Sequence, residues 1–285
     1  MTVKCTSRYA THPADYARYD MQQLKDHYLV TGLFRPDEVN FVYTHYERLM
    51  VGGAMPVDDG LELESIDLLK APYFLERREL GAINVGGSGS VEVDGERFAL
   101  GYKDALYVGA GNRSVVFHSD DAANPAKFYL NSAPAHTAYP TRRITLADAD
   151  KMALGSAETA NERVINKLIV NSVLDSCQLQ MGMTELKTGS VWNTMPAHTH
   201  DRRMEAYFYF ELSDDNAVVH FMGPRDETRH VWVLNEQAVV SPPWGIHAGA
   251  GTSNYTFIWG MAGENLDYAD MDTITPVEFG TPEDG

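Results

Sequence analysis

Residues 197–210 read AHTHDRRMEAYFYF, and this stretch decides the fold and the chemistry that we expect of the chain. In a β-strand, side chains at positions i and i+2 point to the same face, so His198 and His200 can bind one ion together. The polar segment 201–204 then predicts a turn, after which Glu205 opens a returning strand. The pattern indicates two strands that present imidazole and carboxylate groups to a common centre.

A further donor, His247, follows the sequence PPWGI at 242–246. The prolines restrict the backbone and predict a rigid turn that brings a later strand back to the same centre. Imidazole suits zinc, iron, copper and nickel, and a carboxylate extends the choice to manganese. We therefore expect one divalent metal ion per chain, with Zn2+ as first choice and Mn2+ or Fe2+ as alternatives. A His-x-His pair alone is a loose motif, but the complete set makes a chance pairing a poor explanation. The predicted metal ligands are His198, His200, Glu205 and His247.

Most of the remaining chain consists of short runs rich in Val, Tyr, Phe and Ile, separated by Gly, Asp and Pro. Such spacing is typical of an all-β barrel or sandwich, and Asp94-Gly95 is a strong signal for a tight turn. Near the N-terminus the composition favours a short helix instead, with Asp20 as the N-cap of a helix over 21–28. We expect strands at 41–46, 81–85, 90–93, 105–108, 127–131, 207–212, 217–222, 230–234 and 255–261.

An internal repeat underlies this pattern. The tripeptide at 76–78 matches the one at 201–203, and KFYL at 127–130 matches TFIW at 256–259. Repetition on this scale predicts two copies of one β-barrel. Between the copies, residues 141–162 are rich in Ala, Asp and Thr, and we expect a linker with a short helix there. The predicted organisation is a first barrel at 1–140, the linker at 141–162 and a metal-binding barrel at 163–285.

The two copies differ in their chemistry. The two copies align at an offset of 125 residues. At the positions of His198, His200 and Glu205 the first copy then has Tyr73, Leu75 and Leu80. A one-residue gap in the alignment would put Glu79 in place of Leu80. A metal site needs those donors, so we expect the first barrel to bind no metal. His118 lies near the place that corresponds to His247. An isolated histidine is more often a hydrogen-bonded or solvent-exposed residue than a metal ligand.

The composition excludes several classes of partner. With 23 Lys and Arg against 40 Asp and Glu, the net charge is −17, which repels nucleic acid and anionic membranes. An anionic substrate would therefore need a local cationic site. The two cysteines suggest no disulfide framework, and no segment is long and apolar enough to span a membrane or to act as a signal peptide. We expect a cytoplasmic protein that acts on a small molecule.

Four stretches have the sequences FLERRELG at 74–81, NTMPAHTHDRRME at 193–205, NEQAV at 235–239 and YTFIWGM at 255–261. Over most of its length the chain resembles the 5-keto-4-deoxyuronate isomerases of the cupin superfamily on these residues. The resemblance implies a bicupin of two jelly-roll-like barrels that assembles as a homo-hexamer. It also implies a metal-dependent ketol-isomerase that interconverts 5-dehydro-4-deoxy-D-glucuronate and 3-deoxy-D-glycero-2,5-hexodiulosonate in pectin and uronate catabolism.

Such a reaction needs a proton carrier, a hydrogen-bond donor and a group that binds the substrate carboxylate. Glu205 could carry the proton, and Tyr207 and Tyr209 share its face of the predicted strand. Arg203 also shares this parity, so we prefer it to Arg202 as the residue that binds the carboxylate. We expect the walls of the pocket to include Trp244 and Trp259.

Two other functions fit the same residues. A cupin-type oxygenase would use a similar ligand set with redox-active iron, so the ligands alone do not exclude it. A non-enzymatic sugar-binding bicupin is the second alternative, because one fold hosts many roles. Oxygen uptake would favour the first alternative, and binding of uronates without turnover would favour the second.

Overall fold

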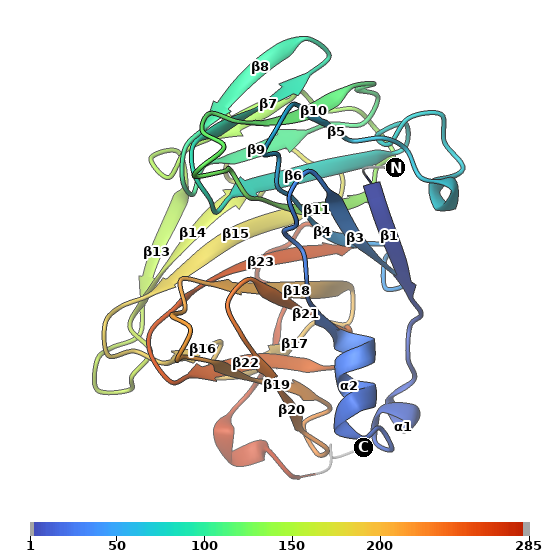
Figure 1. The fold of residues 1–285 in the computed structure, drawn as a ribbon. Coiled ribbons are helices and arrows are strands. Elements are labelled where there is room, and N and C mark those ends of the chain that lie inside the picture. Colours follow the sequence, from blue (N-terminus) through green and yellow to red (C-terminus); the bar gives the residue numbers. More distant parts are fainter. Residues whose placement is uncertain (1–2, 282–285) are drawn as a thin grey trace. The chain divides into compact units, whose positions relative to one another are not determined.

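The structure, a computed structural model, describes residues 3–281 and is built mostly of β-strands, drawn as arrows in Figure 1. No described helix is long and apolar enough to cross a membrane. The chain forms two compact units, each made of segments that are discontinuous in sequence. Within the described residues, the first unit comprises 3–8, 32–150 and 167–181, and the second comprises 9–31, 151–166 and 182–281.

The first unit contains a seven-stranded sheet and a four-stranded sheet. One cluster of buried apolar residues draws on both sheets, and the rings of Phe117 and Phe128, one from each sheet, lie 5.3 Å apart. A core between two sheets is the usual way for strands to bury their apolar faces. The larger sheet has the order β1 (Val3–Arg8), β3 (Val39–Thr44), β4 (Met50–Ala54), β11 (Phe128–Pro134), β6 (Arg78–Asn84), β9 (Ala105–Val108) and β12 (Arg142–Ile144), and the smaller has the order β5 (Leu61–Glu62), β10 (Val115–Ser119), β7 (Gly89–Val93) and β8 (Glu96–Leu100).

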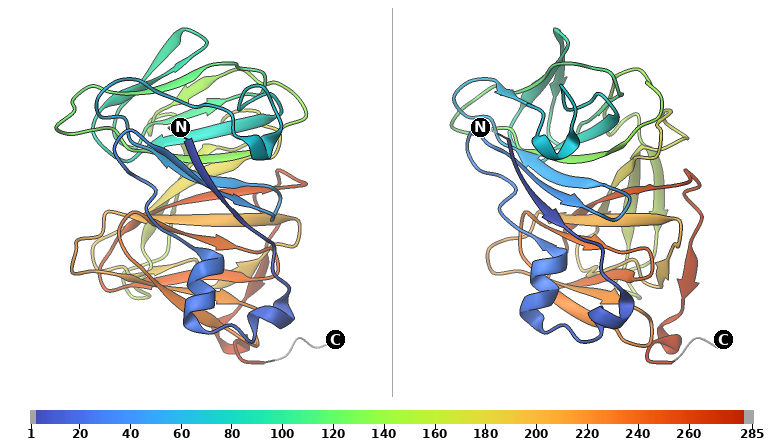
Figure 2. Two further views of the ribbon diagram at one scale, coloured as in Figure 1. Left: turned by 45° about the vertical axis from the view of Figure 1, so that its right-hand side comes forward. Right: turned by 90° about the vertical axis from the view of Figure 1, so that its right-hand side faces the viewer.

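The second unit contains sheets of seven, four and two strands, which can be followed from further sides in Figure 2. The strand at 203–210 is buried at every position, whereas the strand at 229–233 alternates, with Trp232 exposed between buried Val231 and Val233. The sheet orders are β13 (Asp150–Leu154), β14 (Arg163–Ile169), β15 (Gln180–Leu186), β23 (Thr256–Gly263), β18 (Arg203–Phe210), β21 (Gln237–Ser241) and β2 (Leu29–Val30); β16 (Trp192–Asn193), β22 (Ile246–Gly251), β19 (Val218–Gly223) and β20 (Arg229–Val233); and β17 (Ala197–Thr199) with β24 (Asp272–Ile274).

The predicted N-terminal helix is confirmed as α2 (Met21–Tyr28). Its N-cap is Asp20, whose side chain accepts from the backbone N–H of Gln23, while the Gln23 side chain accepts from the N–H of Asp20. This reciprocal capping box satisfies two backbone donors that would otherwise lack partners. The other helices are short: α1 (Pro13–Tyr16) and the 3₁₀ turns at Asp67–Leu69 and Pro276–Glu278.

The predicted linker helix is wrong. Residues 141–162 contain no helix and instead form β12 and β13, with turns between and after them. β12 pairs antiparallel with β9, and the carboxylate of Asp148 then closes a turn by accepting from the backbone N–H and hydroxyl of Thr145. The alanine content favoured a helix only weakly, and pairing with a strand distant in sequence outweighs such a local preference.

The two units share one strand pattern. In the first, β6 pairs with β11 so that Leu80 lies opposite Ser132; in the second, β18 pairs with β23 so that Glu205 lies opposite Met261. Ser132 lies four residues after Phe128 in β11, and Met261 lies four residues after Phe257 in β23. Because the sequence repeat aligns these two phenylalanines, Leu80 and Glu205 occupy equivalent positions in the two units. Glu79 is instead held by the hydroxyl of Tyr107 and by the backbone N–H groups of 177–179.

Candidate metal centre

The four predicted ligands converge in the second unit. The ligand atoms of His198, His200, Glu205 and His247 all lie within 4.8 Å of one another. One carboxylate oxygen of Glu205 lies 3.0 Å from Nε2 of His200 and 2.8 Å from Nε2 of His247, and the latter atom lies 3.0 Å from Nε2 of His198. The residues come from β17, the turn after it, β18 and β22, so three separate strands build one centre.

Hydrogen bonds behind the ligands orient two of the imidazoles. Nδ1 of His200 lies 2.9 Å from the carbonyl oxygen of Arg203, and Nδ1 of His247 lies 3.2 Å from Oγ of Ser241. A carbonyl oxygen only accepts, so Nδ1 of His200 carries a hydrogen. Both rings consequently turn Nε2 towards Glu205, as is usual for histidines that bind a metal through one nitrogen and a protein group through the other.

Burial and charge determine how these groups ionise. Burial raises the pKa of Glu205, but the neighbouring His247 and His200 outweigh it and hold this pKa below its usual value. The pKa of His198 lies well below its usual value, because the ring is buried and has His247 beside it. Burial lowers the pKa of His200, yet the bond to Glu205 raises it overall. The centre therefore pairs a carboxylate with imidazoles that include a neutral one.

This donor set fits a divalent transition metal. Three imidazole nitrogens and one carboxylate oxygen match the ligand preferences of zinc, iron and manganese. Three of the four side chains are almost completely buried, which leaves His198 as the member most accessible from outside. In the part of the chain that the structure describes, no other cluster of histidine, cysteine and acidic residues could hold a metal ion.

A cavity of about 200 Å³ opens beside the centre. His198, Glu205 and Tyr207 form the part of its wall that belongs to the metal site. Trp259 contributes an aromatic wall, and it fits only because Gly182 has no side chain, since a Cβ there would collide with the indole. The other residues that line the cavity are Met152, Leu154, Arg163, Ile165, Thr184, Thr194, Pro196, Phe257, Met261, Tyr268 and Met271.

Comparison with known proteins places this arrangement in a family. Residues 34–275 match the model of the KduI/IolB family. The chain belongs to the KduI/IolB family. The resemblance inferred from the sequence is thereby confirmed.

Curated relatives of this family member carry the name 4-deoxy-L-threo-5-hexosulose-uronate ketol-isomerase. The protein of Formosa agariphila is 62% identical over 98% of this chain and 100% of the relative. The protein of Bacteroides fragilis is 60% identical over 93% of this chain and 95% of the relative. The protein of Halalkalibacterium halodurans is 53% identical over 94% of this chain and 97% of the relative.

Solved structures support the fold. An IolB-like protein from Salmonella typhimurium superposes with a TM-score of 0.65 at 16% identity, covering 79% of this chain and 87% of the other. Oxalate decarboxylase from Lactobacillus farciminis superposes with a TM-score of 0.55 at 11% identity, covering 79% of each chain. At these identities the likeness concerns the fold alone, which is mostly β and resembles that of cupins.

The two tyrosines predicted to assist catalysis lie in different surroundings in this KduI/IolB family member. Tyr207 lines the cavity, and its hydroxyl lies 2.8 Å from that of Thr194. Tyr209 is fully buried away from the cavity, with its hydroxyl 2.7 Å from Nδ1 of His220. Burial raises the pKa of both tyrosines well above the usual value, so both hydroxyls stay protonated near neutral pH.

The two arginines predicted to bind the substrate both contact the segment 264–270. Arg202 is exposed and forms an ion pair with Glu264. Arg203 is completely buried and donates from Nη2 to the carbonyl oxygen of Asp270 at 3.1 Å, while its Nε and Nη1 have no hydrogen-bond partner. Neither side chain lines the cavity. This segment brings Tyr268 to the cavity, so the arginines contact a part of its wall rather than its interior.

Of the two tryptophans predicted to line the pocket, only one lies at this cavity. Trp259 lines the cavity beside the cluster. Trp244 packs edge-on against Tyr16, with ring centroids 5.4 Å apart, and does not line the cavity. The turn that carries Trp244 thus brings His247 to the cluster, while its own indole packs against Tyr16 of α1.

The sequence reasoning missed Arg163, Thr194 and Tyr268, which all line the cavity. Arg163 immediately follows the segment that we expected to be a linker, so no pattern pointed to it. Thr194 lies inside the stretch that resembles the family, and this was an available signal. Ser241 directly precedes the PPWGI turn, but its bond to His247 depends on the strand pairing of β18 with β21.

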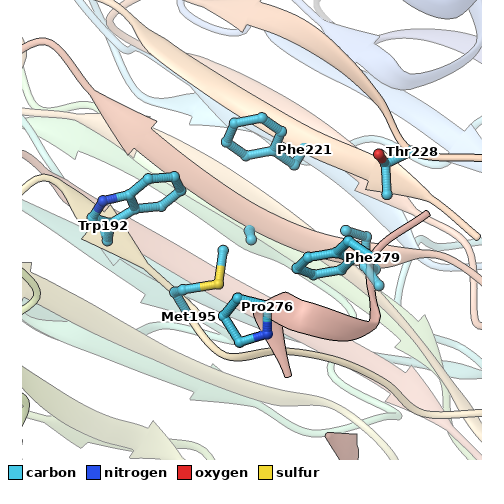
Figure 3. Close-up of a pocket in the computed structure, with 8 residues that line it drawn as sticks. Trp192, Met195, Phe221, Thr228, Pro276 and Phe279 are labelled. Carbon is cyan, nitrogen blue, oxygen red and sulfur yellow. The ribbon is translucent and has the colours of Figure 1, made fainter. Parts of the chain in front are cut away.

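A second pocket, of about 370 Å³, lies on the opposite face of β22 (Figure 3). Ile246 and Ala248 line it, and they flank His247 in the strand, so their side chains point away from the metal centre. Figure 3 shows Trp192, Phe221 and Phe279 around the space. None of the described side chains that line it is ionisable, so residues 3–281 supply no group for acid–base chemistry there.

Proposed function

We propose that this chain is a metal-dependent ketol-isomerase that interconverts 5-dehydro-4-deoxy-D-glucuronate and 3-deoxy-D-glycero-2,5-hexodiulosonate. The observation that carries the proposal is 62% identity along the whole of a relative named as such an isomerase. The His/Glu cluster beside a cavity supports it, because the reaction needs charge stabilisation next to a bound sugar.

The chemistry moves a hydrogen between two neighbouring carbons, one of which bears a carbonyl group. We propose that His198, His200, Glu205 and His247 hold the metal ion. A divalent ion there would act as a Lewis acid for the negative charge that develops on substrate oxygens. The buried side chains exclude water from one side of the site, which strengthens every electrostatic interaction inside it.

The chain's own residues then supply hydrogen bonds and proton transfer. Tyr207 fits the role of a neutral donor to a substrate oxygen, because its hydroxyl lies at the cavity and its high pKa keeps it protonated. We propose Glu205 as the proton carrier, since it lines the cavity; to take up a proton its carboxylate would have to detach from the metal ion. For Tyr209 we propose an indirect role through its bond to His220.

A direct assay tests this function. We expect the zinc-loaded protein to convert 5-dehydro-4-deoxy-D-glucuronate under anaerobic conditions, as followed by NMR of the substrate carbons. Activity that required oxygen and iron would support a cupin-type oxygenase instead. Binding without turnover would support a sugar-binding protein. Activity restored by Mn2+ or Fe2+ but not by Zn2+ would replace our choice of metal without changing the reaction.

Three features of domain organisation, location and assembly complete the proposal. The shared strand pattern of the two units supports two cupin barrels, with the metal in the second. We propose a cytoplasmic homo-oligomer, a hexamer by analogy with the family. Light scattering of the purified protein tests the subunit number.

A further inference from the structure

Among the described side chains that line the cavity, Arg163 is the only arginine or lysine. It opens β14, and its side chain is half-buried. Glu205 and Tyr207 line the same cavity, so a ligand there could touch all three residues. The guanidinium therefore lies in the wall of the cavity in which we propose that the chemistry takes place.

The guanidinium of Arg163 has unused hydrogen-bonding capacity. Nη1 donates to the carbonyl oxygen of Asn161 at 2.9 Å, and within residues 3–281 no carboxylate pairs with the group. Burial lowers the pKa of Arg163, an effect opposed by the neighbouring Tyr207 and Tyr268. Arginine still stays charged, because its ordinary pKa lies far above neutrality. A charged, half-buried fork without an acidic partner is suited to an anionic ligand.

The other nearby arginines are less suited to this task. Arg202 already pairs with Glu264 on the surface. Arg203 is sealed from solvent and bonded to the backbone of Asp270. Reaching a ligand would require both side chains to leave the segment that they contact.

The charge of the substrate makes such a group necessary. The chain carries a net charge of −17, so a sugar acid meets repulsion on approaching the protein. We propose that Arg163 binds the carboxylate of the uronate and makes the cavity selective for sugar acids. This inference rests on the proposed function for the identity of the natural substrate, but the selectivity concerns any uronate.

Binding of a stable probe tests the inference without turnover. We would titrate the metal-loaded protein with D-galacturonate and with its methyl ester, which has the same ring and no charge. The wild-type protein should bind the acid more tightly than the ester. In Arg163→Gln the preference should fall by roughly 10- to 100-fold, as expected for the loss of a hydrogen bond between charged groups. Arg163→Lys should fall between the two, because a point charge replaces a fork.

Arg18→Gln is the matched control, since Arg18 is an exposed arginine of the same unit outside the cavity. It should keep the wild-type preference. Metal content and circular dichroism would show that Arg163→Gln is folded, and Arg163→Lys covers the case in which it is not. Equal preference in the wild type and in either Arg163 variant would overturn the inference. Loss of turnover in the wild type with the binding preference intact would instead count against the isomerase function alone.

Discussion

Nδ1 of His200 lies 2.9 Å from the backbone carbonyl oxygen of Arg203. The backbone at the start of β18 therefore orients the imidazole of a proposed metal ligand that lies three residues earlier in the chain. The side chain of the same Arg203 donates to the carbonyl oxygen of Asp270, in a segment that leads to the cavity wall. Ligand geometry and the shape of the cavity are consequently linked through one residue.

Loss of one proposed ligand should weaken metal binding. We expect one ion per chain in the wild type, and His247→Ala should lower the affinity at least 10-fold because a four-ligand site loses a donor. Elemental analysis after dialysis measures the content. His118→Ala, a histidine of the first unit, is the control and should retain the metal. Two ions per wild-type chain would contradict a single centre.

Ser241 should tune the metal site without contacting the ion. Ser241→Ala removes the partner of Nδ1 of His247 and should weaken metal binding by about 10- to 100-fold, as is usual for groups that orient a ligand. Competition with a chelator measures the affinity. Ser253→Ala, outside the cavity, is the control. An unchanged affinity in Ser241→Ala would show that burial alone holds the ring of His247.

Tyr207 should act mainly on the rate. Tyr207→Phe removes a donor at the cavity, and kcat should fall by about 10- to 1000-fold with a smaller change in KM. Tyr209→Phe provides the comparison, since it removes a buried bond to His220 and should lower stability by about 1 kcal/mol. Steady-state kinetics and thermal unfolding of both variants separate these effects. Equal losses of kcat in the two variants would argue against a direct role for Tyr207.

Hydrogen transfer should proceed through an enediolate rather than a hydride shift. Glu205 and Tyr207 both line the cavity, so proton carriers are available beside the reacting carbons. Turnover in heavy water should place deuterium on the carbon that gains hydrogen, although a shielded carrier can return part of the original hydrogen. Mass spectrometry of the product measures the label. Product free of deuterium after many turnovers would favour the hydride shift.

His220 should make the stability of the protein depend on pH. Burial lowers its pKa from 6.5 to about 3. As the pH falls, His220 therefore takes up a proton in the unfolded chain before it does so in the folded chain. The free energy of unfolding should fall between about pH 6.5 and pH 3, by up to roughly 1.4 kcal/mol per pH unit. Urea unfolding of wild type and His220→Phe between pH 7 and about pH 5 measures this. The variant should be less stable at neutral pH but less sensitive to acid, and equal slopes would contradict the assignment.

The helix over 21–28 and the cluster of four ligands could be predicted because both depend on short-range geometry. An Asp followed three residues later by Gln fixes a helix start through local hydrogen bonds. Alternation along a strand places His198 and His200 together, and a tight turn places Glu205 nearby. Chain order alone carries this information.

The linker and the choice of arginine could not be predicted in the same way. Residues 142–144 form a strand because β9 offers them a partner, and nothing in their own composition reveals that partner. Alternation along the strand puts Arg203 on the same face of β18 as Glu205. This alternation does not reveal which segment covers a side chain at the end of the strand.

The sequence by itself determined the donor set and its centre, since the spacing of His198, His200 and Glu205 leaves a pair of strands few ways to arrange them. Only the tertiary structure decided that Arg163 lines the cavity while Arg202 and Arg203 contact the segment 264–270. The reason is physical: a binding cavity is bounded by strands that meet through long-range pairing, and its walls are known only when those pairings are known.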